Sequence, residues 1–194
     1  MRILPVIVSA FLAANAAAAA PAPKPHPQAS RAKPAVAPLD ALFAQLARAQ
    51  SPAEAQPIEN QIFRLFEASG SPTVDLLMAR ATAATTDGDT GVAKRLFVSV
   101  TDIAPGYAEG WHARAQLEQE SGDDEAAILA LEKTIKLNPR QFAAYAELGD
   151  MLEEYGNKAG ALKMYRRAIK LDPQLEGAAR KVRQLERDVE GQGI

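Results

Sequence analysis

The chain repeats itself every 34 residues, and this period constrains its fold more than any other feature. Four independent columns share the period: prolines, glycines, alanines and a column of small residues. Their members are Pro105, Pro139 and Pro173, then Gly88, Gly122 and Gly156, then Ala93, Ala127 and Ala161, and finally Ala81, Ala115 and Gly149. A unit this short cannot bury an apolar face alone, so consecutive units must stack on one another. The period predicts three stacked units, at 74–107, 108–141 and 142–175.

Each unit divides at its glycine into two apolar stretches. In the third unit Tyr145, Leu148 and Leu152 precede Gly156 at spacings of 3 and 4, which mark an amphipathic helix. We expect each glycine to end a first helix in a left-handed conformation and each proline to stop a second one. The alanine and small-residue columns would let the paired helices approach closely. The sequence therefore predicts an all-α fold, an α-solenoid of antiparallel helix pairs.

These residues resemble the tetratricopeptide repeat family, whose pattern is W-x2-L-G-x2-Y, then A-x3-F and a terminal P. The third unit fits best, through Tyr145, Leu148, Gly149, Leu152, Ala161, Tyr165, Ala168 and Pro173. Arg80 and Arg114 replace the Leu of the pattern in the first two units, and we expect both guanidiniums to be partly buried and bound to carbonyls or carboxylates. The sequence is also similar to tetratricopeptide proteins of alphaproteobacteria that carry a signal peptide.

The resemblance implies that the first helices of the units line a concave groove, and that this groove binds a protein or peptide. The groove residues that it implies are Asp75, Met78, Thr82, Glu109, His112, Gln116, Gln119, Ala146, Asp150 and Glu153. Because no Lys or Arg is among them, we expect a neutral to basic partner, bound in part by Asp150 and Glu153. We expect His112 to contact the ligand or to be exposed, and to weaken binding of a basic ligand when it gains a proton near pH 6–7.

Two further segments flank the three units. The apolar spacing predicts helices at 40–49 and 57–69, with Pro57 in the first turn of the second one. We interpret this pair, within 39–73, as a degenerate fourth unit. The stripe from Leu175 to Val189 predicts a capping helix within the C-terminal segment 176–194, and a dimer seam is the alternative interpretation of its spacing.

The N-terminal segment has the composition of a targeting sequence rather than of a folded unit. Residues 1–20 combine one early Arg, an apolar stretch and a run of small residues, as in a secretory signal peptide. A retained membrane anchor is the alternative, since the uncharged stretch is close to the length that spans a bilayer. Residues 21–38 hold six of the thirteen prolines and predict an extended linker. With a bacterial source, we expect a periplasmic protein without a membrane span after signal cleavage.

Composition excludes several kinds of chemistry. The chain has no cysteine and two histidines, so we expect no disulfide, no thiolate metal site and no cofactor. Residues 39–194 hold 18 basic and 24 acidic side chains, which disfavours nucleic acid as a partner. No nucleophile or second histidine accompanies His112, and the acids from Glu118 to Glu125 fit a solvated, helix-capping role better than catalysis. We therefore expect a scaffold for protein binding and no enzyme. The alternatives are an accessory subunit of an envelope enzyme or assembly, and a self-associating structural protein.

Overall fold

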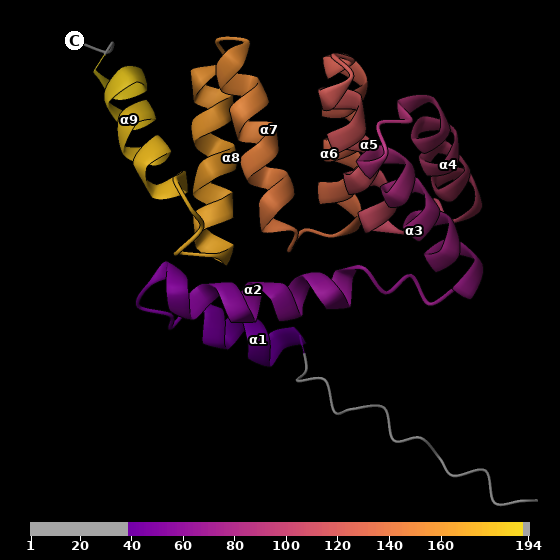
Figure 1. Ribbon diagram of the computed structural model, residues 1–194. Coiled ribbons are helices and arrows are strands. Elements are labelled where there is room, and N and C mark those ends of the chain that lie inside the picture. Colours follow the sequence, from indigo (N-terminus) through magenta and orange to yellow (C-terminus); the bar gives the residue numbers. More distant parts are fainter. Residues whose placement is uncertain (1–38, 192–194) are drawn as a thin grey trace, which may run out of the picture. The chain divides into compact units, whose positions relative to one another are not determined.

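The computed structural model describes residues 39–191, apart from the side chain of Glu190. This part of the chain contains helices and no strand, as the apolar spacing predicts (Figure 1). In chain order the helices are α1 (Leu39–Leu46), α2 (Pro52–Phe66), α3 (Pro72–Thr86), α4 (Thr90–Ile103), α5 (Ala108–Glu120), α6 (Asp124–Leu137), α7 (Phe142–Glu154), α8 (Lys158–Leu171) and α9 (Ala178–Glu190).

The three predicted units are the pairs α3–α4, α5–α6 and α7–α8. The turn inside each pair contains the glycine of the repeat, and Gly88, Gly122 and Gly156 have φ values of 76°, 76° and 74°. A side chain at φ > 0 is strained, which is why glycine occupies this position in every unit. The second helix then begins at an Asp or Asn whose side chain accepts a hydrogen bond from its first turn.

The small-residue columns lie where the paired helices touch. Ala81, Ala93, Ala127 and Ala161 are fully buried. Gly149 of α7 packs against the ring of Tyr165 of α8, and a Cβ added at Gly149 would lie only 3.1 Å from that ring. The absence of a side chain at Gly149 therefore lets α7 and α8 approach closely. The close approach of helices in the α-solenoid is therefore confirmed.

The C-terminal helix α9 packs on the last unit. Gly177, with a φ of 73°, precedes it, and Ala178, Val182 and Leu185 are buried in one cluster with residues of α8. Because this apolar stripe is already covered within the molecule, the capping interpretation is confirmed and the stripe is not a dimer seam.

The N-terminal helix pair is present, but it is not a fourth unit at the end of the stack. Figure 1 shows α2 lying across the ends of the repeat helices, beneath the turn that enters α7 and the turn that leaves α8. Phe142, at the start of α7, is fully buried in the cluster formed by Leu42, Leu46 and Ile62. Its ring centroid lies 5.0 Å from that of Phe63 and 6.4 Å from that of Phe43. The pair therefore buries its apolar face against the edge of the third unit.

Polar contacts fix this placement over long sequence distances. Arg140 forms an ion pair with Asp40, and its guanidinium stacks 3.9 Å from the ring centroid of Phe43. Gln174 Nε2 donates a 3.0 Å hydrogen bond to the carbonyl oxygen of Ala49. Glu59 faces Asp172, and burial followed by the negative charge of Asp172 raises the pKa of Glu59 to about 7.

The expected boundary of α2 is wrong. The helix begins at Pro52, because the Ser51 side chain accepts a hydrogen bond from the Glu54 amide and Pro52 suits a first turn. Pro57 consequently lies inside the helix and not in its first turn. An N-cap followed by proline is a stronger start signal than an isolated proline.

The predictions for the signal peptide at 1–20, the linker at 21–38 and the last residues of the C-terminal segment fall outside the described residues. Among residues 39–191, none of the helices is long and apolar enough to cross a membrane.

Candidate functional site

A hollow of about 490 Å³ opens between α2, α3 and α5, and we call it the acidic hollow. Three carboxylates line it, Glu67, Asp75 and Glu109, together with one cation, Arg64. Its other walls mix polar and apolar side chains, namely Met78, Thr82, Tyr107 and Gln116 with Ala68, Ala79 and Ala113.

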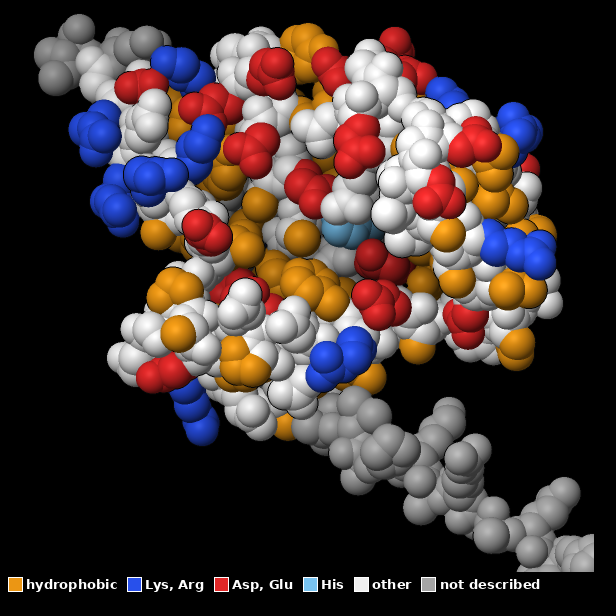
Figure 2. Space-filling model, in the orientation of Figure 1, with side chains coloured by type: hydrophobic (Ala, Val, Ile, Leu, Met, Phe, Trp, Pro, Cys, Tyr) orange, Lys and Arg blue, Asp and Glu red, His pale blue; other side chains and the backbone are white. Residues whose placement is uncertain are grey.

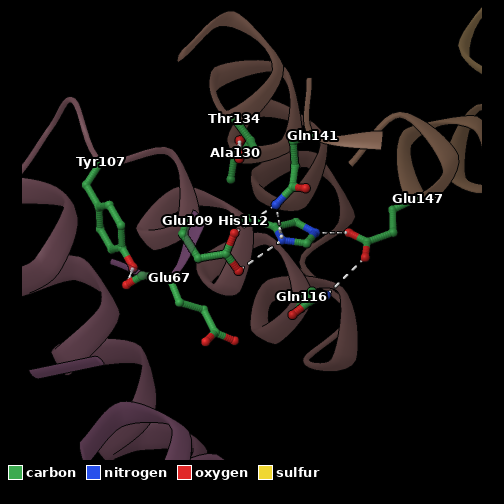
Figure 3. A network of polar contacts seen from close by, with 9 residues as sticks. All are labelled: Glu67, Tyr107, Glu109, His112, Gln116, Ala130, Thr134, Gln141 and Glu147. Atoms are coloured by element: carbon green, nitrogen blue, oxygen red, sulfur yellow. Dashed lines mark hydrogen bonds and ion pairs between the residues drawn. The ribbon is translucent and has the colours of Figure 1, made fainter. Parts of the chain in front are cut away.

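Tyr107 connects this hollow to the N-terminal helix pair. Its hydroxyl donates a 2.7 Å hydrogen bond to the carbonyl oxygen of Glu67, just after α2 (Figure 3). Burial, followed by the negative charges of Glu109, Asp75 and Glu67, raises the pKa of the hydroxyl, which stays protonated. Asp75 is held as well, because its Oδ1 accepts hydrogen bonds from the backbone amide and the hydroxyl of Ser69.

Behind the wall of the hollow lies a polar cluster centred on His112, which we call the His112 cluster (Figure 3). His112 Nε2 lies 2.9 Å from Glu147 Oε2, and His112 Nδ1 lies 3.4 Å from Glu109 Oε1. Two amides complete the cluster. Gln141 Nε2 donates to Glu109 Oε2 at 2.8 Å, and Gln116 Nε2 donates to Glu147 Oε1 at 3.0 Å. The cluster joins α5 to α7 across the boundary between the second and third units.

The two carboxylates keep His112 protonated. Burial is the largest single influence and opposes the positive charge, since the residue is only 5% exposed. The hydrogen bonds to Glu109 and Glu147 and their negative charges outweigh it and raise the pKa of His112 to about 10. The imidazolium is therefore charged at neutral pH, with both ring nitrogens directed at carboxylates.

This state corrects the expectation for His112. The side chain is buried, so it neither contacts a ligand directly nor faces solvent, and it does not gain a proton near pH 6–7 because it already carries one. A doubly protonated ring has no free lone pair and cannot accept a proton as a general base. Among the described residues, no group of His, Asp and Glu could hold a metal ion.

The structure brings five of the ten expected groove residues into the acidic hollow: Asp75, Met78, Thr82, Glu109 and Gln116. Gln119 is exposed outside it, and Ala146 is partly buried on α7. His112 lies behind the wall. Figure 2 shows this face, with acidic side chains around the pale blue histidine and cations gathered over α9.

Asp150 and Glu153 are not free acids of the groove. Lys181 of α9 donates a 2.7 Å hydrogen bond to Glu153 Oε2 and lies 3.7 Å from Asp150 Oδ1. The hydroxyl of Tyr165 donates to Asp150 as well. Because the capping helix supplies this cation, the two acids link α7 to α9, and their charge is partly balanced within the molecule. Their attraction of a ligand stays a prediction.

The sequence predicts a groove without Lys or Arg, but two cations reach this face from helices other than the first helices of the units. Arg64 comes from α2 and Lys181 from α9.

Arg80 and Arg114 are the two arginines that replace the Leu of the repeat pattern. Arg114 behaves as expected, because its Nε donates a 2.8 Å hydrogen bond to Glu118 Oε1, and Glu118 is only 1% exposed. Arg80 is exposed, and no described residue forms an ion pair or hydrogen bond with it.

One signal in the sequence could have revealed the burial of His112. The repeat places it in register with Met78 and Ala146, and both equivalents are apolar. Gln141 is likewise in register with Tyr107 at the start of the first helix. A position that is apolar in two units is expected to be buried in the third as well, and a charged histidine buried there needs acidic neighbours.

Comparison with known proteins identifies the repeat. The tetratricopeptide repeat profile matches residues 108–141 and 142–175, the second and third units. A TPR repeat-containing protein of Rhizobium etli is 31% identical over 153 residues, which span 79% of this chain and 75% of that protein.

Solved structures share the fold. The TPR domain of Sgt2 from Aspergillus fumigatus superposes with a TM-score of 0.56 at 22% identity, covering 63% of this chain and 83% of that one. MamA gives a TM-score of 0.56 at 20% identity, covering 71% and 81%. The first TPR domain of Spaghetti (RPAP3), bound to the HSP90 peptide SRMEEVD, gives 0.56 at 18% identity, covering 60% and 93%. From its period, its helix pairs and its relative in Rhizobium, the chain belongs to the tetratricopeptide repeat family.

Proposed function

We propose that this protein is a binding scaffold without catalysis of its own, and that the acidic hollow takes a peptide segment of neutral to basic charge. The observation that carries the proposal is the hollow itself, which places Glu67, Asp75 and Glu109 around the single cation Arg64 beside apolar walls. Attraction to a cationic side chain would orient the segment, while Met78 and the ring of Tyr107 would contact its apolar parts.

Two solved relatives support peptide binding as the class of function. RPAP3 is bound to the HSP90 peptide SRMEEVD, and the TPR2B domain of yeast Sti1 is in complex with pHsp70. The peptide SRMEEVD carries three acidic side chains, which suit a cationic groove. Because the acidic hollow has the opposite charge balance, we do not propose a peptide of that kind for this protein.

Export is part of the proposal. The positive start, apolar stretch and small residues of 1–20 support a signal peptide, and delivery to the periplasm would follow in a bacterial cell. Cell fractionation with sequencing of the mature N-terminus tests this, since retention in the cytoplasm with an intact N-terminus would contradict it.

Site-directed crosslinking tests the hollow. A photoreactive residue at Thr82, an exposed position in its wall, should capture the partner in cells. Affinity of the captured partner is then measured for the wild type, Glu67→Lys and the control Glu176→Lys, an exposed acid distant in sequence from the hollow. We expect Glu67→Lys to weaken binding roughly tenfold, with added salt weakening the wild type as well. Equal binding by both variants would show that the acidic hollow is not the site.

A further inference from the structure

Two acidic side chains meet where the N-terminal helix pair packs against the third unit. Glu59 belongs to α2, and Asp172 follows the last residue of α8. Asp172 is fully buried, and its Oδ1 accepts a 3.0 Å hydrogen bond from the backbone amide of Gln174. Its second oxygen, Oδ2, is also buried, and no amide, hydroxyl or cation within residues 39–191 donates to it. A buried carboxylate oxygen without a donor costs free energy, so a donor is needed at this position.

Glu59 supplies this donor when it carries a proton. Its carboxyl group faces Asp172. Two ionised carboxylates would repel each other there, whereas a protonated one can donate a hydrogen bond to its neighbour. Burial, followed by the negative charge of Asp172 and the hydrogen bond to it, raises the pKa of Glu59 to about 7. The proton lies on Glu59, because the hydrogen bond from the Gln174 amide favours the charged form of Asp172.

Within the described chain, no other charge competes for this proton. Only the charge of Asp172 acts on the pKa of Glu59. On the neighbouring elements, Asp40 and Arg140 form an ion pair with each other. The other charged side chains near the contact in sequence are exposed, namely Arg48, Glu54, Arg64, Lys170 and Glu176. No third acid or histidine joins Glu59 and Asp172 to complete a metal site among residues 39–191, so a proton fits this position better than a metal ion.

The two acids lie at a contact between distant parts of the sequence. Ile58, next to Glu59, and Leu175, just after Asp172, pack against one apolar cluster. From Glu59, α2 continues toward the acidic hollow, whose wall includes Arg64 and Glu67. The strength of the contact between Glu59 and Asp172 therefore also affects how firmly the wall of the hollow is held.

We propose that Glu59 and Asp172 form a pH-dependent latch, in which a proton shared between the two carboxyl groups holds α2 against the end of α8 in acid and its loss weakens this contact. The pKa of Glu59 rises from 4.5 in the unfolded chain to about 7 in the folded protein. A group whose pKa is raised by folding stabilises the fold fully below the lower value and loses that contribution as the pH rises through the higher one. The latch therefore weakens between about pH 4.5 and 7 and changes little above that range. It does not depend on peptide binding by the acidic hollow.

Urea unfolding between pH 5 and 8 tests the latch, with Glu59→Gln as the variant that keeps a donor at every pH. Relative to this variant, the folding equilibrium constant of the wild type should fall about 70-fold from pH 5 to pH 8. The comparison removes the contributions that the two proteins share, including that of His112. Asp172→Asn should also reduce the pH dependence, because it removes the charge that Glu59 faces. The matched control is Glu176→Gln, an exposed acid four residues after Asp172, which should behave as the wild type does.

Hydrogen exchange read by mass spectrometry locates the effect. After correction for the intrinsic pH dependence of exchange, protection of α1 and α2 in the wild type should fall from pH 5 to pH 8 more than protection of α3 and α4. In Glu59→Gln it should not. Parallel stability curves for the wild type and Glu59→Gln would overturn the proposal, and so would a loss of protection that is equal in both proteins. Stabilisation of the wild type by added Ca²⁺ at pH 7 would assign Asp172 Oδ2 to a metal ion and would overturn it as well.

Discussion

Protonation of His112 should make the stability of the protein depend on pH in a window where few other groups titrate. The pKa of His112 rises from 6.5 in the unfolded chain to about 10 in the folded protein. A group whose pKa is raised by folding stabilises the fold fully below its unfolded value and loses that contribution as the pH rises through its folded value. From these two values the protonated ring contributes about 4 kcal/mol at pH 7 and about 1 kcal/mol at pH 9.5. The expected loss over this window is therefore about 3 kcal/mol.

Urea unfolding of the wild type and of His112→Gln at several pH values between 7 and 9.5 measures this loss. The variant should be less stable at pH 7, because Glu109 and Glu147 lose their shared cation, and it should lack most of the pH dependence. Subtracting the two curves removes contributions that they share, including that of Glu59, whose pKa is about 7. Staying below pH 9.5 avoids the tyrosines and lysines.

The control is His26→Gln, which changes the other histidine of the chain and should leave the pH dependence intact. Glu147→Gln provides a second variant that retains the ring but removes one carboxylate, and its loss of stability should begin at lower pH. If the wild type and His112→Gln lose stability in parallel between pH 7 and 9.5, the ring is not protonated in the folded protein and the reasoning fails.

Two further substitutions test the packing, both by urea unfolding at pH 7. Arg114→Leu should cost about 3 kcal/mol because it strands the buried carboxylate of Glu118, whereas the matched change Arg80→Leu at the equivalent exposed position should stay within about 0.5 kcal/mol. Equal effects would mean that the Arg114–Glu118 pair is unimportant. Ala127→Leu should cost about 1–3 kcal/mol because Ala127 is fully buried between α5 and α6, and an unchanged midpoint would contradict the assigned helix contact.

The parts of the fold predicted from the sequence are those determined locally. Gly88, Gly122 and Gly156 mark their turns through backbone conformation alone, and the alanine columns mark the contacts between neighbouring helices. The placement of the N-terminal pair was not predictable in this way. It depends on Phe142 and Arg140, which meet α1 and α2 about a hundred residues away in sequence and do not repeat with the period.

The candidate site was only partly predictable, because some of its residues follow the repeat and others do not. Residues that repeat along the first helices, such as Met78 and Gln116, do line the acidic hollow. Arg64 and Lys181 come from helices outside the repeats and add positive charge to this face. The repeat pattern identifies positions on the first helices only, so it could not predict these two residues. The burial of His112 depends on Glu147 in the next unit, so it belongs to the boundary between units and not to either helix alone.

The N-terminal pair also has a consequence for how the protein folds. Repeat proteins usually have contacts only between neighbours along the chain, and their units can unfold one after another. Here the contact from Asp40 to Arg140 joins the beginning of the described chain to the end of the second unit, and the contact from Ala49 to Gln174 joins it to the third unit. Such distant contacts raise the contact order, which slows folding, and they link the loss of the third unit to the loss of α1 and α2. The N-terminal helix pair and the third unit are therefore expected to fold and unfold together, although they lie far apart in the sequence.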